Sequence, residues 1–333
     1  MKKDSCLDKI KVTEIKEGGK MKKRILTIFL IFTLVIPQLF ACEDPAVSIS
    51  YVYRNGEEPK TVVLTEENLG RPEDPEREGY VFLGWSTDPD ALYFYDFSEL
   101  PSESIMLYAV WLPDYEKLSE RISSEAMTAN VKISSEYYSV GIAPSATSQG
   151  SGVIFYENST HYYVLTNHHV LHKDGDYFYT DYFVYDAYGN KYIGELLDSD
   201  PKYDLGVLRI RKLSSVSLSS LKISESVPDR YETVASLGSP KGQFNSVTLG
   251  EVSNYKVIEQ TDGSEVEFEV IWHTAYANHG SSGGALVNTC LELVGINFAV
   301  ATNEKSEFMY CVAVPGAKIA EYLSSSGFTY VKA

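Results

Sequence analysis

Three residues whose types together perform acyl transfer lie far apart in the chain: His169, Asp204 and Ser282. Ser282 stands in the run Gly280-Ser281-Ser282-Gly283-Gly284, where glycines let the backbone turn a hydroxyl and nearby amide N–H groups toward one point. A serine nucleophile needs such amides as an oxyanion hole, a base to take its proton, and a carboxylate to orient that base. Taken alone, the run fits a glycine turn between two strands equally well.

A base and a carboxylate occur upstream in suitable local patterns. His169 follows an apolar run and stands in Thr-Asn-His-His-Val, and Asp204 opens the apolar run Asp-Leu-Gly-Val-Leu. The order histidine, aspartate, serine is that of chymotrypsin-type enzymes. The adjacent His168 is expected to point to the opposite side of the strand end, and Asp198 and Asp200 are expected to be loop charges. These patterns together favour a nucleophilic Ser282 over a simple turn.

Residues 129–333 resemble a trypsin-like serine protease, closest to the HtrA/Deg type. The resemblance rests on the three patterns above and on Leu237-Gly238-Ser239-Pro240. It implies a mainly β fold with two barrels and a serine endopeptidase that works through an acyl-enzyme without a cofactor or metal. His169 would be the base, Asp204 its orienting acid and Ser282 the nucleophile. The amides of Gly280 and Ser282 would form the oxyanion hole, with Ser281 as a third donor.

The same resemblance places the pocket for the substrate side chain before the scissile bond, the P1 side chain. Its walls would be Tyr276, Asn278, Phe298, Val300 and Cys311. Val300 and Cys311 stand where roomier pockets keep glycine, and no aspartate is placed to pair with a basic side chain. We therefore expect a shallow apolar pocket that accepts Ala or Val.

Residues 21–41 have the pattern of a signal peptide: a basic start, an apolar run and a small residue before Cys42. The ending Leu-Phe-Ala-Cys resembles a bacterial lipobox, which implies cleavage before Cys42 and its lipidation. Plain secretion is the alternative. Because a signal peptide should open a chain, we predict that Met21 is the true start and that residues 1–20 are a wrongly assigned upstream leader.

Residues 45–112 alternate apolar and polar positions between turns, which predicts short strands. Their closing pattern, with Trp111 at its end, resembles the Listeria-Bacteroides repeat (internalin B-repeat) in one copy, a β-grasp-like module used as a spacer or binding unit. A cell-surface ligand is therefore a candidate partner. Trp85, Trp111, Tyr80 and Phe97 are expected to form its core. Residues 113–128 carry helical spacing and predict a linker helix, with a solvated linker as the alternative.

The whole chain of 333 residues has a formal net charge of -17, which argues against nucleic-acid binding because phosphates would be repelled. Expected partners are protein or peptide substrates and, through the lipid, the outer face of the bacterial cytoplasmic membrane. A disulfide between Cys290 and Cys311 is left open for an extracellular chain. The chain ends soon after a predicted terminal helix, so regulation through a PDZ domain is not expected. The competing hypothesis is a surface-binding lipoprotein whose protease-like domain is a scaffold or pseudoenzyme.

Overall fold

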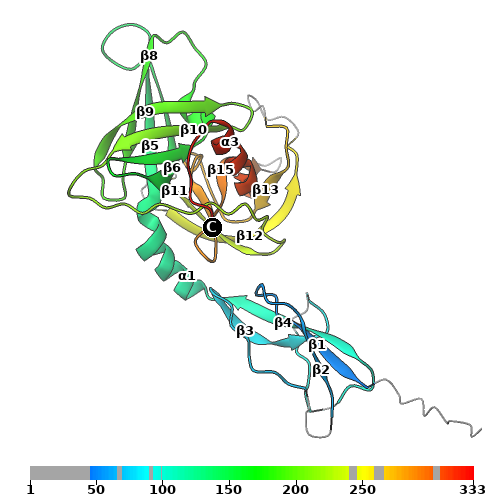
Figure 1. Ribbon diagram of the computed structural model, residues 1–333. Coiled ribbons are helices and arrows are strands. Elements are labelled where there is room, and N and C mark those ends of the chain that lie inside the picture. Colours follow the sequence, from blue (N-terminus) through cyan, green and yellow to red (C-terminus); the bar gives the residue numbers. More distant parts are fainter. Residues whose placement is uncertain are drawn as a thin grey trace, which may run out of the picture. The chain divides into compact units, whose positions relative to one another are not determined.

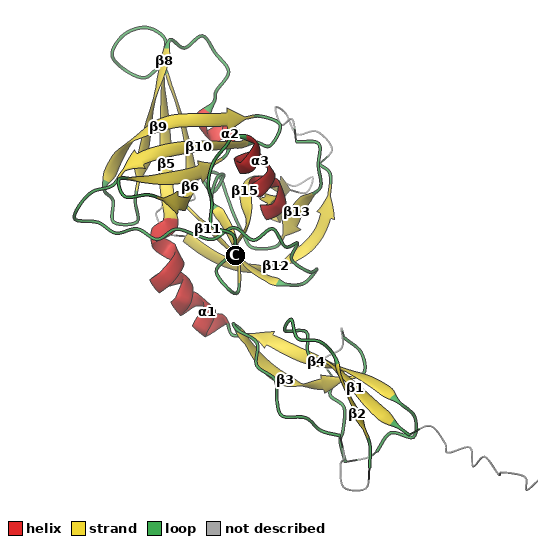
Figure 2. Cartoon of the chain, in the orientation of Figure 1, coloured by secondary structure: helices red, strands yellow, loops and turns green. Residues whose placement is uncertain are grey.

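The computed structural model describes residues 46–65, 70–89, 93–98, 100–239, 246–258, 266–302 and 308–333. Strands dominate these residues and form one open sheet and two closed barrels, as Figure 1 and Figure 2 show. The expected leader, signal peptide and lipidation site Cys42 lie outside the described residues. No helix in the described part of the chain has the length and apolar character needed to span a bilayer.

The open sheet comes first in the chain and has the strand order β2-β1-β4-β3. Strand β1 pairs antiparallel with β2 and parallel with β4, so the sheet is mixed. The strands are β1 (Ser48–Val52), β2 (Lys60–Val63), β3 (Tyr80–Ser86) and β4 (Ile105–Pro113).

One face of this sheet carries the aromatic core of the small module. Trp85 is almost fully buried there, and Trp111 and Phe97 pack against the same cluster, as expected. Tyr80 was wrongly expected in this core. It begins β3 opposite Pro113, at the end of the sheet, and the Arg77 guanidinium lies 3.8 Å from the centre of its ring.

A short helix follows the sheet. The Asp114 side chain caps it by accepting a hydrogen bond from the Lys117 backbone N–H at 2.9 Å. Leu118, Ile122 and Ala126 are buried and join the core of the barrels rather than that of the small sheet. The helical segments are α1 (Tyr115–Arg121), the π-helical turn η1 (Ile122–Ala126) and the 3₁₀ turn η2 (Met127–Ala129).

The first barrel closes in the order β10-β7-β6-β5-β8-β9. A short helix, α2 (His168–Leu171), directly follows β7 and thereby places His169 at a strand end. The strands are β5 (Asn130–Tyr138), β6 (Ala146–Glu157), β7 (His161–Thr166), β8 (Tyr179–Tyr185), β9 (Lys191–Asp200) and β10 (Leu205–Arg211).

The second barrel closes in the order β11-β12-β13-β16-β15-β14, and helix α3 (Gly316–Ser325) packs on β15 and β16. One cluster of buried apolar side chains includes residues of both barrels, so the barrels share a core, and a second cluster lies within the second barrel. The predicted two-barrel fold is confirmed. The strands are β11 (Thr233–Gly238), β12 (Ser246–Lys256), β13 (Val270–His273), β14 (Ala285–Asn288), β15 (Leu293–Thr302) and β16 (Phe308–Pro315).

Candidate active site

The imidazole of His169 is bound to the carboxylate of Asp204. Nδ1 of His169 donates to Oδ2 of Asp204 at 2.8 Å, and the backbone N–H of His169 donates to Oδ1 at 3.0 Å. Both carboxylate oxygens of Asp204 therefore bind the same residue, His169. This leaves Nε2 of the imidazole free to act as a base, because Nδ1 carries the proton.

The backbone of Asp204 takes a conformation that few side chains favour. Its φ angle is +49°, in the left-handed region that aspartate tolerates better than most residues. The buried amide of Asn167 donates to the Asp204 carbonyl at 2.8 Å and ties this turn to the end of β7. Asn167 was not predicted as a site residue, although it belongs to the Thr-Asn-His-His-Val pattern.

Ser282 and His169 line the same cavity, which has a volume of about 550 Å³. The two come from different barrels, His169 from α2 after β7 and Ser282 from the loop between β13 and β14. Among the hydrogen bonds of the described residues, the His169 imidazole bonds to Asp204 and not to the Ser282 hydroxyl, a looseness common in sites without substrate. The hydroxyl of Ser282 and the imidazole of His169 thus border a common cavity, and Asp204 holds the imidazole from the other side of its ring.

The loop that carries Ser282 is shaped by two glycines in the left-handed region, Gly280 with φ +94° and Gly283 with φ +84°. The backbone N–H groups of Gly280 and Ser282 have no acceptor among the described residues. The backbone N–H of Ser281 donates to the Asn278 carbonyl at 2.8 Å. Two amides are thus available to stabilise an oxyanion, and the expected third donor, Ser281, is engaged within the loop.

A buried polar network lies beneath this loop and was not predicted. His273 is fully buried and bonds through Nε2 to Oδ1 of Asn297 at 2.9 Å. The Asn297 amide donates to Ser236 Oγ at 3.0 Å, and the Asn297 carbonyl accepts from the Gly283 N–H at 2.8 Å. Burial lowers the pKa of His273 to about 4, so the network contains a neutral imidazole.

The cavity continues into a partly apolar pocket. Tyr276, Asn278, Phe298 and Val300 line it, as does Phe308, which sequence reasoning missed and whose ring meets that of Tyr276 edge to face at 5.0 Å. Phe308 begins β16 and belongs to none of the sequence motifs. The pocket therefore has aromatic and aliphatic walls.

Cys311 is placed differently from the expectation. It is fully buried on β16, where it pairs with Val300 of β15, and it does not line the cavity. Burial raises the pKa of its thiol to about 12, so it stays protonated and unreactive. Cys290 is exposed, and both cysteines are free thiols.

Three neighbouring residues could also have served as the base or the acid. Their side chains make hydrogen bonds with other groups instead. Nδ1 of His168 lies 2.7 Å from Ser199 Oγ, and burial lowers the His168 pKa. Asp198 accepts from the Ser326 hydroxyl at 2.6 Å, and Asp200 accepts from the Lys202 N–H at 2.9 Å. Within the described residues, no group of three side chains is arranged to bind a metal ion.

Two family models match the chain. Residues 150–296 match the trypsin-like peptidase domain, and residues 48–110 match the Listeria-Bacteroides repeat domain. The resemblances drawn from the sequence are thereby confirmed for both parts.

Curated relatives point the same way for the barrels. A serine protease Do-like HtrA of Bacillus subtilis is 32% identical over 184 residues, which cover 54% of this chain and 40% of that protein. The periplasmic serine endoprotease DegP of Escherichia coli is 30% identical over 185 residues, covering 53% of this chain and 35% of that protein. The chain thus spans well under half the length of these relatives.

Among solved structures, a variant of the HtrA-type protease AlgW with a tripeptide is similar to this chain. It is 26% identical with a TM-score of 0.50, and the match covers 63% of this chain and 62% of that one.

Proposed function

From the premise that this chain contains a trypsin-like peptidase domain similar to HtrA and DegP, we propose that it is a serine endopeptidase with the triad His169, Asp204 and Ser282. The observation that carries the proposal is the His169 to Asp204 pair, at 2.8 Å, beside a cavity that Ser282 shares. Protein chains are the proposed substrates, in keeping with the tripeptide in the similar AlgW structure.

The mechanism follows from the hydrogen bonds between His169 and Asp204. Nε2 of His169 takes the hydroxyl proton as Ser282 Oγ bonds to the peptide carbonyl carbon, and the carbonyl oxygen becomes an oxyanion. Asp204 stabilises the imidazolium that forms. The imidazolium then protonates the leaving amine, which leaves an ester on Ser282, and water hydrolyses this ester with the same imidazole as base.

The oxyanion would be held by the backbone N–H groups of Gly280 and Ser282. Their lack of an acceptor among the described residues supports this role, because a preorganised donor in a shielded site costs no reorganisation during the reaction. Each donor of this kind contributes a factor of about 10² to 10³ in kcat.

The experiment that tests the proposal compares Ser282→Ala with Ser217→Ala, a change of an exposed serine outside the cavity. Wild type and Ser217→Ala should hydrolyse casein and react with a fluorophosphonate probe, and Ser282→Ala should do neither. Labelling that persists in Ser282→Ala would refute the assignment. If the folded wild-type chain does not react with the fluorophosphonate probe, the alternative of a surface-binding pseudoenzyme is favoured instead.

For specificity, we propose a preference for small aliphatic P1 residues, Ala or Val. The pocket carries Val300 and two aromatic rings, Tyr276 and Phe308, and no acidic side chain lines it among the described residues. Cleavage of a peptide library preferentially after Arg, Glu or Phe, rather than after Ala or Val, would contradict this.

For location, we propose the outer face of the bacterial cytoplasmic membrane, through a lipid on Cys42. The support is the lipobox-like sequence at Cys42 and the periplasmic assignment of the similar DegP. The small module would act as a spacer or bind a surface ligand. Metabolic labelling with a fatty acid should mark the wild-type chain and not Cys42→Ala; equal labelling of both would exclude Cys42.

A further inference from the structure

The buried hydroxyl of Ser151 connects the first barrel to the loop that carries Ser282. Ser151 lies on β6, and its Oγ donates to the Gly280 carbonyl at 2.7 Å. The same Oγ accepts from the Ser239 N–H at 2.8 Å. Ser151 is fully buried, so water does not compete for these bonds.

These contacts fix one peptide group of the loop at both of its polar ends. The peptide between Gly280 and Ser281 has its C=O bound by the Ser151 hydroxyl and its N–H bound by the Asn278 carbonyl at 2.8 Å. A peptide group is planar, so the two bonds together define its orientation. The next peptide unit toward the N-terminus carries the Gly280 N–H.

Glycine alone does not hold that N–H in place. Gly280 has φ +94°, and without a Cβ it can leave this region at little steric cost. The neighbouring peptide group, bonded at its C=O and its N–H, therefore restrains the direction of the Gly280 N–H. If Ser151 lost its hydroxyl, the partly buried Gly280 carbonyl would lose this donor, and the peptide would gain by turning toward another one.

We propose that the Ser151 hydroxyl is a positioning group for the oxyanion hole, holding the Gly280 carbonyl so that the Gly280 N–H stays available to the reacting oxygen. This inference rests on the proposed serine protease function and adds a residue to it. Ser151 is not among the residues that line the cavity. Its backbone N–H also donates to the Ser282 carbonyl at 2.7 Å, and that bond persists when the side chain is changed.

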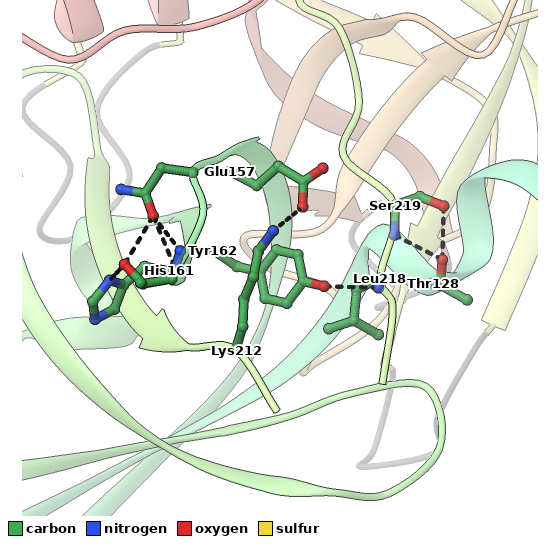
Figure 3. Close-up of polar contacts among 9 residues, drawn as sticks. Thr128, Glu157, His161, Tyr162, Lys212, Leu218 and Ser219 are labelled. Atoms are coloured by element: carbon green, nitrogen blue, oxygen red, sulfur yellow. Dashed lines mark hydrogen bonds and ion pairs between the residues drawn. The ribbon is translucent and has the colours of Figure 1, made fainter. Parts of the chain in front are cut away.

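A matched control lies in the 3₁₀ turn η2, directly before strand β5. The Thr128 hydroxyl accepts from the Ser219 N–H at 3.0 Å and donates to the Ser219 hydroxyl at 2.8 Å, so it too makes one bond of each kind (Figure 3). Neither Thr128 nor Ser219 lines the cavity. Thr128→Val therefore removes a comparable pair of bonds at a place unconnected with the loop.

The test measures Ser151→Ala, Ser151→Cys and Thr128→Val in the full chain, with melting temperature, kcat and KM on a peptide ester and on its thionoester. The thionoester carries sulfur in place of the carbonyl oxygen. The ratio of the ester rate to the thionoester rate therefore reports how well the oxyanion hole stabilises a negatively charged oxygen. We expect Ser151→Ala to lower kcat on the ester by about 10- to 100-fold, less than the loss of a whole donor. KM should stay near the wild-type value and the ratio should fall.

Ser151→Cys keeps a weak donor and should give an intermediate kcat, which decides the question even if Ser151→Ala does not fold. Thr128→Val should lose stability without a change in kcat or in the ratio. An unchanged kcat and ratio in folded Ser151 variants would overturn the inference and leave the protease function standing. A wild-type chain without hydrolysis or fluorophosphonate labelling would instead overturn the proposed function itself.

Discussion

His273 shows how a single buried residue makes stability depend on pH. Its side chain is fully buried and bonds through Nε2 to Asn297. Burial lowers its pKa to about 4, against about 6.5 in an unfolded chain. Between these two values the unfolded chain binds a proton that the folded chain does not. The free energy of unfolding is therefore highest, as far as His273 is concerned, above pH 6.5. It falls as the pH falls from 6.5 toward 4.

We expect His273→Gln to reduce this loss, because glutamine can donate to Asn297 without titrating. Between pH 7 and pH 4.5 the wild-type free energy of unfolding should fall by roughly 2 to 3 kcal/mol more than that of His273→Gln, at about 1.4 kcal/mol per pH unit. Urea unfolding at both pH values measures the difference. His172→Gln, at a side chain 62% exposed, is the control and should behave as wild type. Parallel curves for His273→Gln and wild type would show that His273 does not titrate on unfolding.

The residues of the site differ in how far the sequence could predict them. His169, Asp204 and Ser282 each stand in a short pattern of neighbouring residues, so their types and order were readable before the fold was known. The partners of Ser151 come close only when the two barrels pack together, and those of His273 only when the second barrel closes. The Ser151 hydroxyl meets a carbonyl 129 positions away, and no local pattern carries that information.

At the scale of an element, the loop between β13 and β14 depends on Gly283 for space as well as for backbone conformation. Gly283 and Gly189 have nearly equal φ angles, +84° and +85°. A Cβ on Gly283 would overlap the Ser151 carbonyl and the Thr166 hydroxyl, whereas a Cβ on Gly189 would meet nothing within 4 Å. Alanine at Gly189 would introduce backbone strain alone, whereas alanine at Gly283 would introduce backbone strain and steric overlap.

Both Gly→Ala variants should lose about 1 kcal/mol of stability from the left-handed backbone. Gly283→Ala should lose roughly 2 kcal/mol more through the overlap. Its kcat/KM should fall by about 100-fold, because the added methyl group displaces the loop that carries Ser282. Gly189→Ala should keep its activity. Thermal unfolding and peptide hydrolysis measure the two effects. Equal losses of stability and activity in both variants would mean that the loop tolerates the extra methyl group.

At the scale of the whole molecule, the sequence predicted two barrels and a separate small module, since alternating strands, turns and family-like motifs are local signals. It did not indicate to which core the intervening helix belongs. Leu118, Ile122 and Ala126 have helical spacing, which predicts one apolar face of a helix. The spacing does not indicate which surface this face packs against. The structure places these side chains in the barrel core. Helix α1 is therefore part of the protease fold as well as a connection.

This placement predicts unequal effects of two truncations. A chain that begins at residue 113 keeps the Asp114 cap and the helix, and it should hydrolyse a short peptide with a kcat/KM close to that of the full chain, because the small module has its own core. A chain that begins at residue 128 loses the burial of Leu118, Ile122 and Ala126. Each of the two larger side chains contributes about 1.5 to 3 kcal/mol, so its melting temperature should fall by roughly 10 °C or more.

The double variant Leu118→Ala and Ile122→Ala in the full chain tests the same contacts without changing chain length, and Lys117→Ala on the exposed side of the helix is its control. The double variant should be destabilised and should lose activity on heating well before the control does. If the chain from residue 128 melted at the temperature of the chain from residue 113, the helix would contribute nothing to the barrels. Its buried face would then have to be explained by the small module, with which these side chains share no cluster.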